Sequence, residues 1–325
     1  MSVSGTEALQ GAGGGLEFLD VGGDIEALSP LQLFWRRFRQ DRLALASLAF
    51  IAVVVVVALA APLIVELLGL PGPNTQNSNL TDSFGSPLGP SGAHPFGVDE
   101  LGRDVASRVI YGTRVSLEVG IIGTAIATSI GVFFGVLAGF YRGWVDTLLS
   151  RLVDVLLSIP ILLLGLGIGA ACAVRGCLSG AIQPGIGVII FLIALANWTY
   201  VYRIIRGLVL SLREREFVDA SRALGASNGR IMFREILPNL VAPIIVYSSL
   251  LIPQNILLEA ALSFLGVGIR PPTASWGQMI ADATPIFNTA WWYMVFPGVA
   301  LLLTVLAFNL LGDGLQDALN PRTAR

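Results

Sequence analysis

The chain has 325 residues, of which 54% are hydrophobic and only 13% are charged. Because a soluble globular domain carries about twice this charged fraction, the composition favours a membrane protein. The net charge is −2 and the sequence contains no lysine, so a strongly basic nucleic-acid-binding protein is excluded and no nucleic-acid partner is expected.

The first 28 residues differ from the rest of the chain. They lack the basic start and apolar run of a secretory signal. The stretch "EALQGAGGGLEFLDVGGD" is glycine-rich and mildly acidic. Residues 1–28 are therefore predicted to form a mobile cytoplasmic tail.

The first membrane span is predicted at Leu43–Val65, where Ser47 is the only polar residue. At a rise of ~1.5 Å per residue, this helix would be about 34 Å long, enough to cross a hydrocarbon core of ~30 Å. Residues 29–70 are expected to combine an amphipathic segment with this span, and membrane lipid is expected around it. Five further apolar runs complete a prediction of an all-α integral membrane protein with six transmembrane helices: 115–140, 152–173, 185–205, 239–264 and 291–312.

Arginine placement predicts the orientation. All 20 cationic residues are arginines. Of these, 15 lie before the first span, after the last span, in or beside the connection between spans two and three, or in or beside the connection between spans four and five. Cationic loops stay in the cytoplasm, so both termini are expected there. Residues 71–112 then form an extracytoplasmic loop, 113–315 the core and 316–325 a cytoplasmic C-terminus.

Several span residues have more than one interpretation. Gly131, Gly135 and Gly139 predict close helix packing, with a hinge as the alternative, and Pro160, Pro243 and Pro253 predict kinks. Asp154 and Glu259 have no charged partner in their own helices. Four polar side chains are candidates for lining a translocation pathway, with interhelical hydrogen bonding as the alternative: Asn197, Gln254, Asn255 and Glu259.

Catalytic and cofactor signatures are absent from the sequence. Without lysine there is no phosphate-binding loop, and the single histidine, His94, favours a solvated loop over a metal site. Catalytic, cofactor-binding and metal-binding residues are therefore not expected, and any ATP-dependent work needs another chain. Cys172 and Cys177 are expected either to pair on an oxidising external side or to remain two buried thiols.

A charged stretch, "EFVDASRALGASNGRIMFREILPNL", interrupts the apolar runs on the cytoplasmic side. It predicts a helix at about 213–222 whose apolar face holds Phe217, Ala220, Ala223 and Leu224. Gly225 is expected to end this helix with a positive φ. A second short helix, capped by Ser227 or Asn228, is expected to reach Glu235, and Pro238 is expected in the first turn of the fifth span.

This stretch resembles the coupling motif of ABC importer permeases. The motif appears here as Asp219-Ala220-Ser221, Gly225 and Glu235-Ile236-Leu237-Pro238, with Asp for Glu, Ser for the second Ala and Glu235 in place of an apolar residue. The stretches "SPLQLFWRRFRQDRLALASLAF", "HPFGVDELGRDVASRVIYGTRVSLEVG" and "EAALSFLGVGIRPPTASWGQMI" are similar to the C-type permease of dipeptide, oligopeptide and nickel importers, over about 29–321.

The resemblance implies a type I ABC importer permease fold in a bacterial cytoplasmic membrane. It also implies a homologous B-type permease, two ABC ATPase subunits that bind ATP and magnesium, and an extracytoplasmic substrate-binding protein. Short peptides are the commonest implied cargo, beside nickel chelates, glutathione and oligosaccharides. The alternative is an ion-coupled secondary carrier or channel; an integral-membrane enzyme is disfavoured. The implied ATPase-coupling residues are Glu216, Phe217, Asp219, Ala220, Ser221, Arg222, Leu224, Gly225, Leu237 and Pro238.

Overall fold

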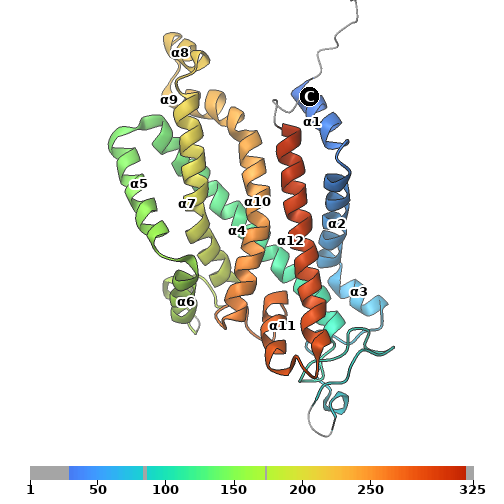
Figure 1. Cartoon of the computed structure of the whole chain (residues 1–325). Coiled ribbons are helices and arrows are strands. Elements are labelled where there is room, and N and C mark those ends of the chain that lie inside the picture. The colour runs from blue at the N-terminus through green and yellow to red at the C-terminus, as the bar shows by residue number, and fades with distance from the viewer. Residues whose placement is uncertain (1–28, 83–85, 173, 320–325) are drawn as a thin grey trace, which may run out of the picture.

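The computed structural model describes residues 29–82, 86–172 and 174–319, so the predicted tail of residues 1–28 lies outside the described part. The described residues form an all-helical bundle (Figure 1). Five helical stretches in it are long and apolar enough to cross a membrane, and a bent helix pair gives a sixth if the pair is counted as one span. The predicted all-α membrane fold is confirmed. The crossings are α2 (Arg42–Leu59), α4 (Val105–Tyr141), α5 (Gly143–Ser158) with α6 (Ile161–Ala171), α7 (Ile186–Leu212), the stretch Asn228–Phe264 and α12 (Trp291–Leu319).

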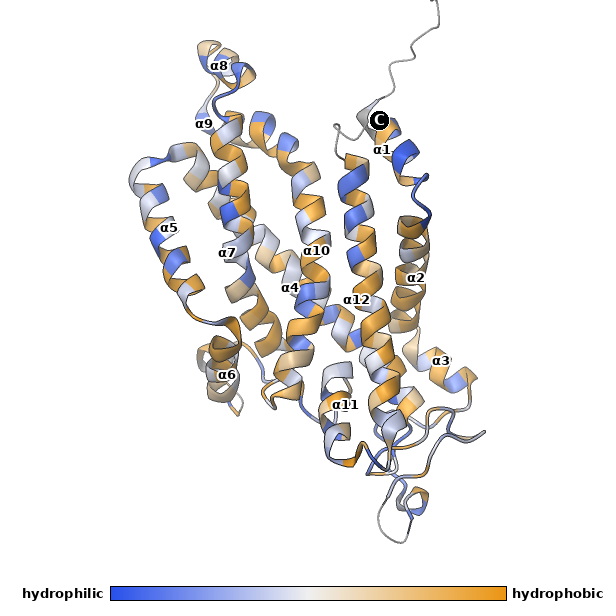
Figure 2. Ribbon diagram, in the orientation of Figure 1, coloured by the Kyte–Doolittle hydropathy of each residue, from blue (hydrophilic) through white to orange (hydrophobic). Residues whose placement is uncertain are grey.

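Shorter helices lie at the two ends of the bundle. The helices α1 (Pro30–Phe38) and α8 (Glu216–Ala223) lie at the same end as the C-terminus of α12, whereas α3 (Ala61–Leu67) and α11 (Trp276–Ala283) lie at the opposite end (Figure 1). Most arginines occur at the first end, which the positive-inside rule makes cytoplasmic. Figure 2 shows that α2 is hydrophobic along its length, while polar residues gather at the link between α1 and α2.

The first span is shorter than the sequence predicts. The helix α2 ends at Leu59, and α3 begins at Ala61 with Pro62 in its first turn. Pro62 has no backbone N–H, so it cannot continue the hydrogen-bond ladder of α2. The residues from Ala61 to Val65 therefore belong to a separate helix.

The second span starts earlier than predicted. The carboxylate of Asp104 accepts a hydrogen bond from the Ser107 backbone N–H at 2.7 Å and caps α4. No proline occurs within α4, which runs for 37 residues to Tyr141; Arg142 then leaves the helix with a φ of +56°,. Residues 105–112, which the sequence places in the extracytoplasmic loop, are instead the first turns of this span.

Prolines have different effects in two spans. Helices α5 and α6 meet at Pro160 with a bend of 84°, so the predicted kink is confirmed. By contrast, α10 (Leu237–Phe264) continues as one helix through both Pro243 and Pro253.

The glycine stripe of α4 packs directly on α7. A Cβ added at Gly131 would lie 2.5 Å from Val201 Cβ, and one at Gly135 would lie 2.9 Å from Ile205 Cβ. Gly139 is equally close to α7. Only hydrogen fits at these positions, so the stripe sets the distance between the two helices.

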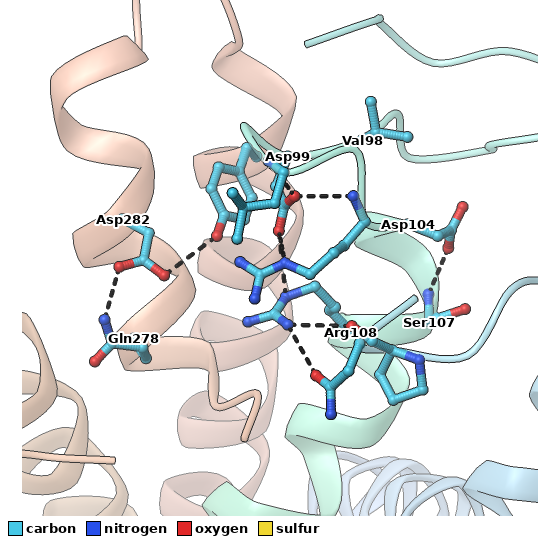
Figure 3. Close-up of polar contacts among 12 residues, drawn as sticks. Val98, Asp99, Asp104, Ser107, Arg108, Gln278 and Asp282 are labelled. Atoms are coloured by element: carbon cyan, nitrogen blue, oxygen red, sulfur yellow. Dashed lines mark hydrogen bonds and ion pairs between the residues drawn. The ribbon is translucent and has the colours of Figure 1, made fainter. Parts of the chain in front are cut away.

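The external end is held by buried charges. The Arg103 Nε donates to Asp99 Oδ2 at 2.7 Å, and the Arg108 Nε lies 3.6 Å from the same oxygen (Figure 3). Arg108 is fully buried and donates to Pro73 O at 3.1 Å. Trp292 of α12 donates to Val98 O at 3.1 Å. These contacts fasten the external loop to the start of α4 and to α12.

Candidate functional site: the cytoplasmic coupling segment

The helix α8 is fixed by local sequence at both ends. Glu216 and Asp219 lie in its first turn, where carboxylates stabilise the positive end of the helix dipole,. At its end, the Ala226 N–H donates to Ser221 O at 3.0 Å and the Gly225 N–H to Arg222 O at 2.9 Å. These two bonds form a Schellman motif, which requires the φ of +79° that Gly225 adopts,.

One apolar side chain anchors α8 to the bundle. Val218 is fully buried in the cluster that contains Phe140 of α4 and Ile231, Met232 and Ile236. The sequence did not predict this burial, because the predicted apolar face consisted of the neighbours of Val218. The i, i+4 pattern gave no reason to prefer Val218, whose burial depends on contacts distant in sequence.

Arginines reinforce this anchor at the end of α4. The Arg213 guanidinium donates to Phe140 O and lies 5.9 Å from the centroid of the same ring. The guanidinium carbon of Arg222 lies 6.0 Å from the centroid of the Phe140 ring, and Arg142 pairs with Glu214 at 2.6 Å. Burial and the nearby Arg142 and Arg222 lower the pKa of Arg213 from its ordinary value. The start of α8 is thus tied to the C-terminal end of α4.

Much of the remaining surface of α8 is exposed in the described chain. Leu224 is 89% exposed and Phe217 is 38% exposed. The side chains of Ala220 and Ala223 are also exposed. The carboxylate of Asp219 pairs only with Arg222, at 3.2 Å. A short helix that presents small and apolar side chains beside charges is suited to contact with another protein.

The second predicted short helix is not separate. Ser227 caps α9 (Asn228–Arg230) by accepting from the Arg230 N–H at 3.4 Å. The chain then continues through the π-helix η3 (Ile231–Ile236) directly into α10. The helix end expected near Glu235 is therefore not seen, whereas Pro238 lies in the first turn of α10 as predicted, where its missing N–H is tolerated,. This continuous helix begins at a cytoplasmic turn and ends at the outer face of the membrane.

Leu237 and Pro238 therefore lie apart from the exposed face of α8. Leu237 is half-buried beside the cluster that holds Val218, and Pro238 is exposed at the start of α10. Asn239 Nδ2 donates to Glu235 O at 2.6 Å across this junction. These residues belong to the connection between α8 and the membrane, and the other predicted coupling residues belong to α8 and its C-terminal turn.

Three of the four candidate pathway residues are engaged in packing. Asn255 is fully buried; it accepts from Asn197 Nδ2 and donates to Thr124 Oγ1 at 2.7 Å, which joins α10 to α7 and α4. Glu259 is fully buried and accepts from Ser263 at 2.8 Å and Ser116 at 3.3 Å. Gln254 alone is exposed. A role for these four residues in a pathway stays a prediction.

Three other sequence features find partners in the structure. Asp154 pairs with Arg203 of α7 at 2.6 Å, a contact between neighbouring spans that the sequence alone did not indicate. The sulfur atoms of Cys172 and Cys177 are bonded to each other at the outer end of α6. His94 Nδ1 lies 2.8 Å from Asp104 Oδ2, and no cluster of three metal-ligating side chains occurs in the described ranges.

Comparison with known proteins gives the family. Residues 131–325 match the family described as binding-protein-dependent transport system inner membrane component, and residues 29–87 match the N-terminal TM domain of oligopeptide transport permease C. The dipeptide transport system permease protein DppC of Alkalihalophilus pseudofirmus is 38% identical over 91% of each chain. DppC of Bacillus subtilis is 40% identical over 92% of this chain and 88% of that one. The glutathione transport system permease protein GsiD of Pectobacterium atrosepticum is 37% identical over 94% of this chain and 96% of that one.

The fold also has a solved counterpart. A chain of the MetNI methionine ABC transporter in an inward-facing conformation superimposes with a TM-score of 0.55 at 19% identity, covering 65% of this chain and 96% of that chain. This likeness confirms the predicted type I importer permease architecture. The chain belongs to the binding-protein-dependent transport system inner membrane components and is an integral permease subunit of the bacterial inner membrane.

Proposed function

We propose that this permease is the C-type subunit of an ATP-driven importer that translocates short peptides. The relatives named for dipeptide and glutathione transport support a peptide cargo. The proposed assembly contains a homologous B-type permease, two ABC ATPase subunits and an extracytoplasmic substrate-binding protein. ATP and magnesium are bound by the ATPase subunits, and this chain has no catalytic site.

The observation that carries the proposal is the shape of α8. Its buried side, Val218, is fixed to the cytoplasmic ends of α4 and η3, while Leu224 and Phe217 face outward. A partner protein that bound the outward face of α8 and then moved would therefore displace α4 and α10 as well. Since α4 packs on α7 through the glycine stripe, the displacement would reach three crossings of the bundle.

The mechanism follows from this connection. ATP binding closes the two ATPase subunits around α8 and its counterpart on the second permease. The bundle helices rock against the second permease, and the pathway opens toward the docked binding protein. Hydrolysis and product release reverse the motion. An ion-coupled carrier, the alternative, would need no such cytoplasmic contact.

A substitution at Gly225 can change the angle between α8 and α9, on which this mechanism depends. A side chain at Gly225 would touch nothing within 4 Å, but a φ of +79° is costly for a β-branched residue,. Gly225→Val should therefore leave the fold intact and alter the α8 angle. Gly225→Asn is the matched control, because asparagine adopts this conformation more readily.

The experiment measures ATP hydrolysis and peptide uptake together in proteoliposomes that contain the whole importer. Gly225→Val is expected to retain assembly and ATP hydrolysis but to lose most binding-protein-dependent uptake, and Gly225→Asn is expected to retain both. Full uptake by Gly225→Val would contradict the coupling role of this turn. Uptake by the purified chain without ATPase subunits, driven by an ion gradient, would favour the carrier.

A further inference from the structure

The helix α1 is held at the cytoplasmic boundary of the membrane. Its start is fixed by a capping box: the Ser29 N–H donates to Gln32 Oε1 at 2.8 Å and the Gln32 N–H donates to Ser29 Oγ at 3.3 Å. Its end is fixed by Phe38, which is 2% exposed and packs with Ala318 of α12. The membrane-crossing helix α2 begins at Arg42, directly after this contact.

The exposed side of α1, next to Phe38, carries a basic face made of Gln32, Trp35, Arg36 and Arg39. The spacing of these residues by three and four positions places them together on the helix surface, and all four side chains are exposed. The Arg39 guanidinium carbon lies 4.9 Å from the centroid of the Trp35 ring. A stacked guanidinium keeps the N–H groups at its edge available to a planar or tetrahedral anion.

The arginines of this face are not neutralised by the rest of the described chain. Arg36 makes no ion pair within the described residues, and neither does Arg42 at the next turn. A groove along the helix is lined by aromatic and by polar or cationic side chains: Gln32, Phe34, Trp35, Arg36 and Arg39. The face thus combines an apolar floor with cationic groups.

The surroundings of the basic face identify its ligand. Below it, toward the membrane centre, α2 presents exposed apolar side chains, with Leu43 at 64% and Val53 at 59%. Acyl chains lie against such a surface in a bilayer, so the headgroups of the same lipids lie at the level of α1. Tryptophan and arginine together are typical of this boundary, and anionic lipids attract basic segments next to a span.

We propose that the basic face of α1 binds the phosphate of an anionic phospholipid in the cytoplasmic leaflet. Arg36 and Arg39 hold the phosphate, and Trp35 lies against the upper part of the acyl chains. A competing occupant is the N-terminal tail, since residues 1–28 contain five acidic residues and no basic ones: Glu7, Glu17, Asp20, Asp24 and Glu26. The lipid is favoured because the face is continuous with the lipid-exposed surface of α2.

The test is native mass spectrometry of the full-length chain in detergent, titrated with phosphatidylglycerol or phosphatidylcholine. Wild-type protein is expected to retain phosphatidylglycerol preferentially. The double variant Arg36→Gln/Arg39→Gln should weaken its binding by about 30-fold, since each basic residue near an anionic membrane contributes about fivefold. The matched control is Arg175→Gln/Arg270→Gln, which removes two exposed arginines from the external side and should leave binding unchanged.

Three results would overturn the proposal. The first is equal phosphatidylglycerol binding by wild type and Arg36→Gln/Arg39→Gln, and the second is equal loss in the external control. The third is a lipid preference that appears only after deletion of residues 1–28, which would identify the tail as the occupant. Lipid binding is measured without ATPase subunits or uptake, so these outcomes do not depend on the proposed transport function.

Discussion

The contact between α4 and α7 should be most sensitive at Gly131. In Gly131→Ala the new Cβ would lie 2.5 Å from Val201 Cβ and 2.8 Å from Trp198 O. Non-bonded carbons normally approach to about 3.5 Å. Although Val201 can change rotamer, its Cβ and the Trp198 carbonyl belong to the backbone framework and cannot move alone. The two helices must therefore separate by several tenths of an ångström.

The expected change in the free energy of unfolding is the difference between an overpacking cost and a gain in helix propensity. Overpacking of this kind costs about 1–3 kcal/mol, whereas replacing a helical glycine by alanine gains about 0.5–1 kcal/mol. Gly131→Ala is therefore expected to lower the free energy of unfolding by about 1 kcal/mol, within a range of about 0–2.5 kcal/mol. Reversible unfolding of the purified chain in mixed micelles with increasing SDS, followed by tryptophan fluorescence, measures this difference.

Gly207 provides the matched control. It lies within α7, and an added Cβ would meet no atom within 4 Å. Gly207→Ala should thus be neutral or stabilising by up to about 1 kcal/mol. Equal stability of Gly131→Ala and Gly207→Ala would refute the inference that the glycine stripe sets the helix separation. Destabilisation by both alanines would show that the cost comes from something other than this contact.

Three further substitutions test other contacts. Asn255→Leu leaves Asn197 and Thr124 without their partner, so the free energy of unfolding in the SDS titration should fall by about 1–2 kcal/mol,; an unchanged value would contradict this. Asp99→Asn removes the carboxylate between Arg103 and Arg108, at an expected cost of about 3–5 kcal/mol in the same assay,, whereas Asp82→Asn in the same external loop is expected to cost far less. Cys172 and Cys177 should bind no maleimide before reduction and two equivalents after it, by intact mass; reaction without reductant would contradict their pairing.

The sequence predicted the crossings well because each carries a local signal. Apolar runs of membrane-spanning length located the five long spans and the bent helix pair, and Pro160 located its 84° bend. The spacing of apolar and acidic residues around Asp219, followed by Gly225, located α8 to within three residues of its observed start. These features depend on neighbouring residues, which any single sequence displays.

The missed features depend on distant contacts. Val218 is buried by Phe140 and Ile231, and nothing in its own helix distinguishes it from Phe217. Arg203 neutralises Asp154 across two spans. The second short helix was predicted to end at Glu235, but η3 continues directly into α10. In each case the tertiary environment decided between local alternatives.

The central claim is that an ATPase subunit covers the outward face of α8. Its most direct test is the maleimide labelling rate of Leu224→Cys, in a background with both native cysteines replaced by serine. Leu224 is 89% exposed in the isolated chain, so the free permease should label rapidly. The control is Val174→Cys on the external side, which is 83% exposed. In the assembled importer, the account predicts at least about tenfold slower labelling at position 224 and no change at position 174. Equal labelling of position 224 with and without the ATPase subunits would contradict it.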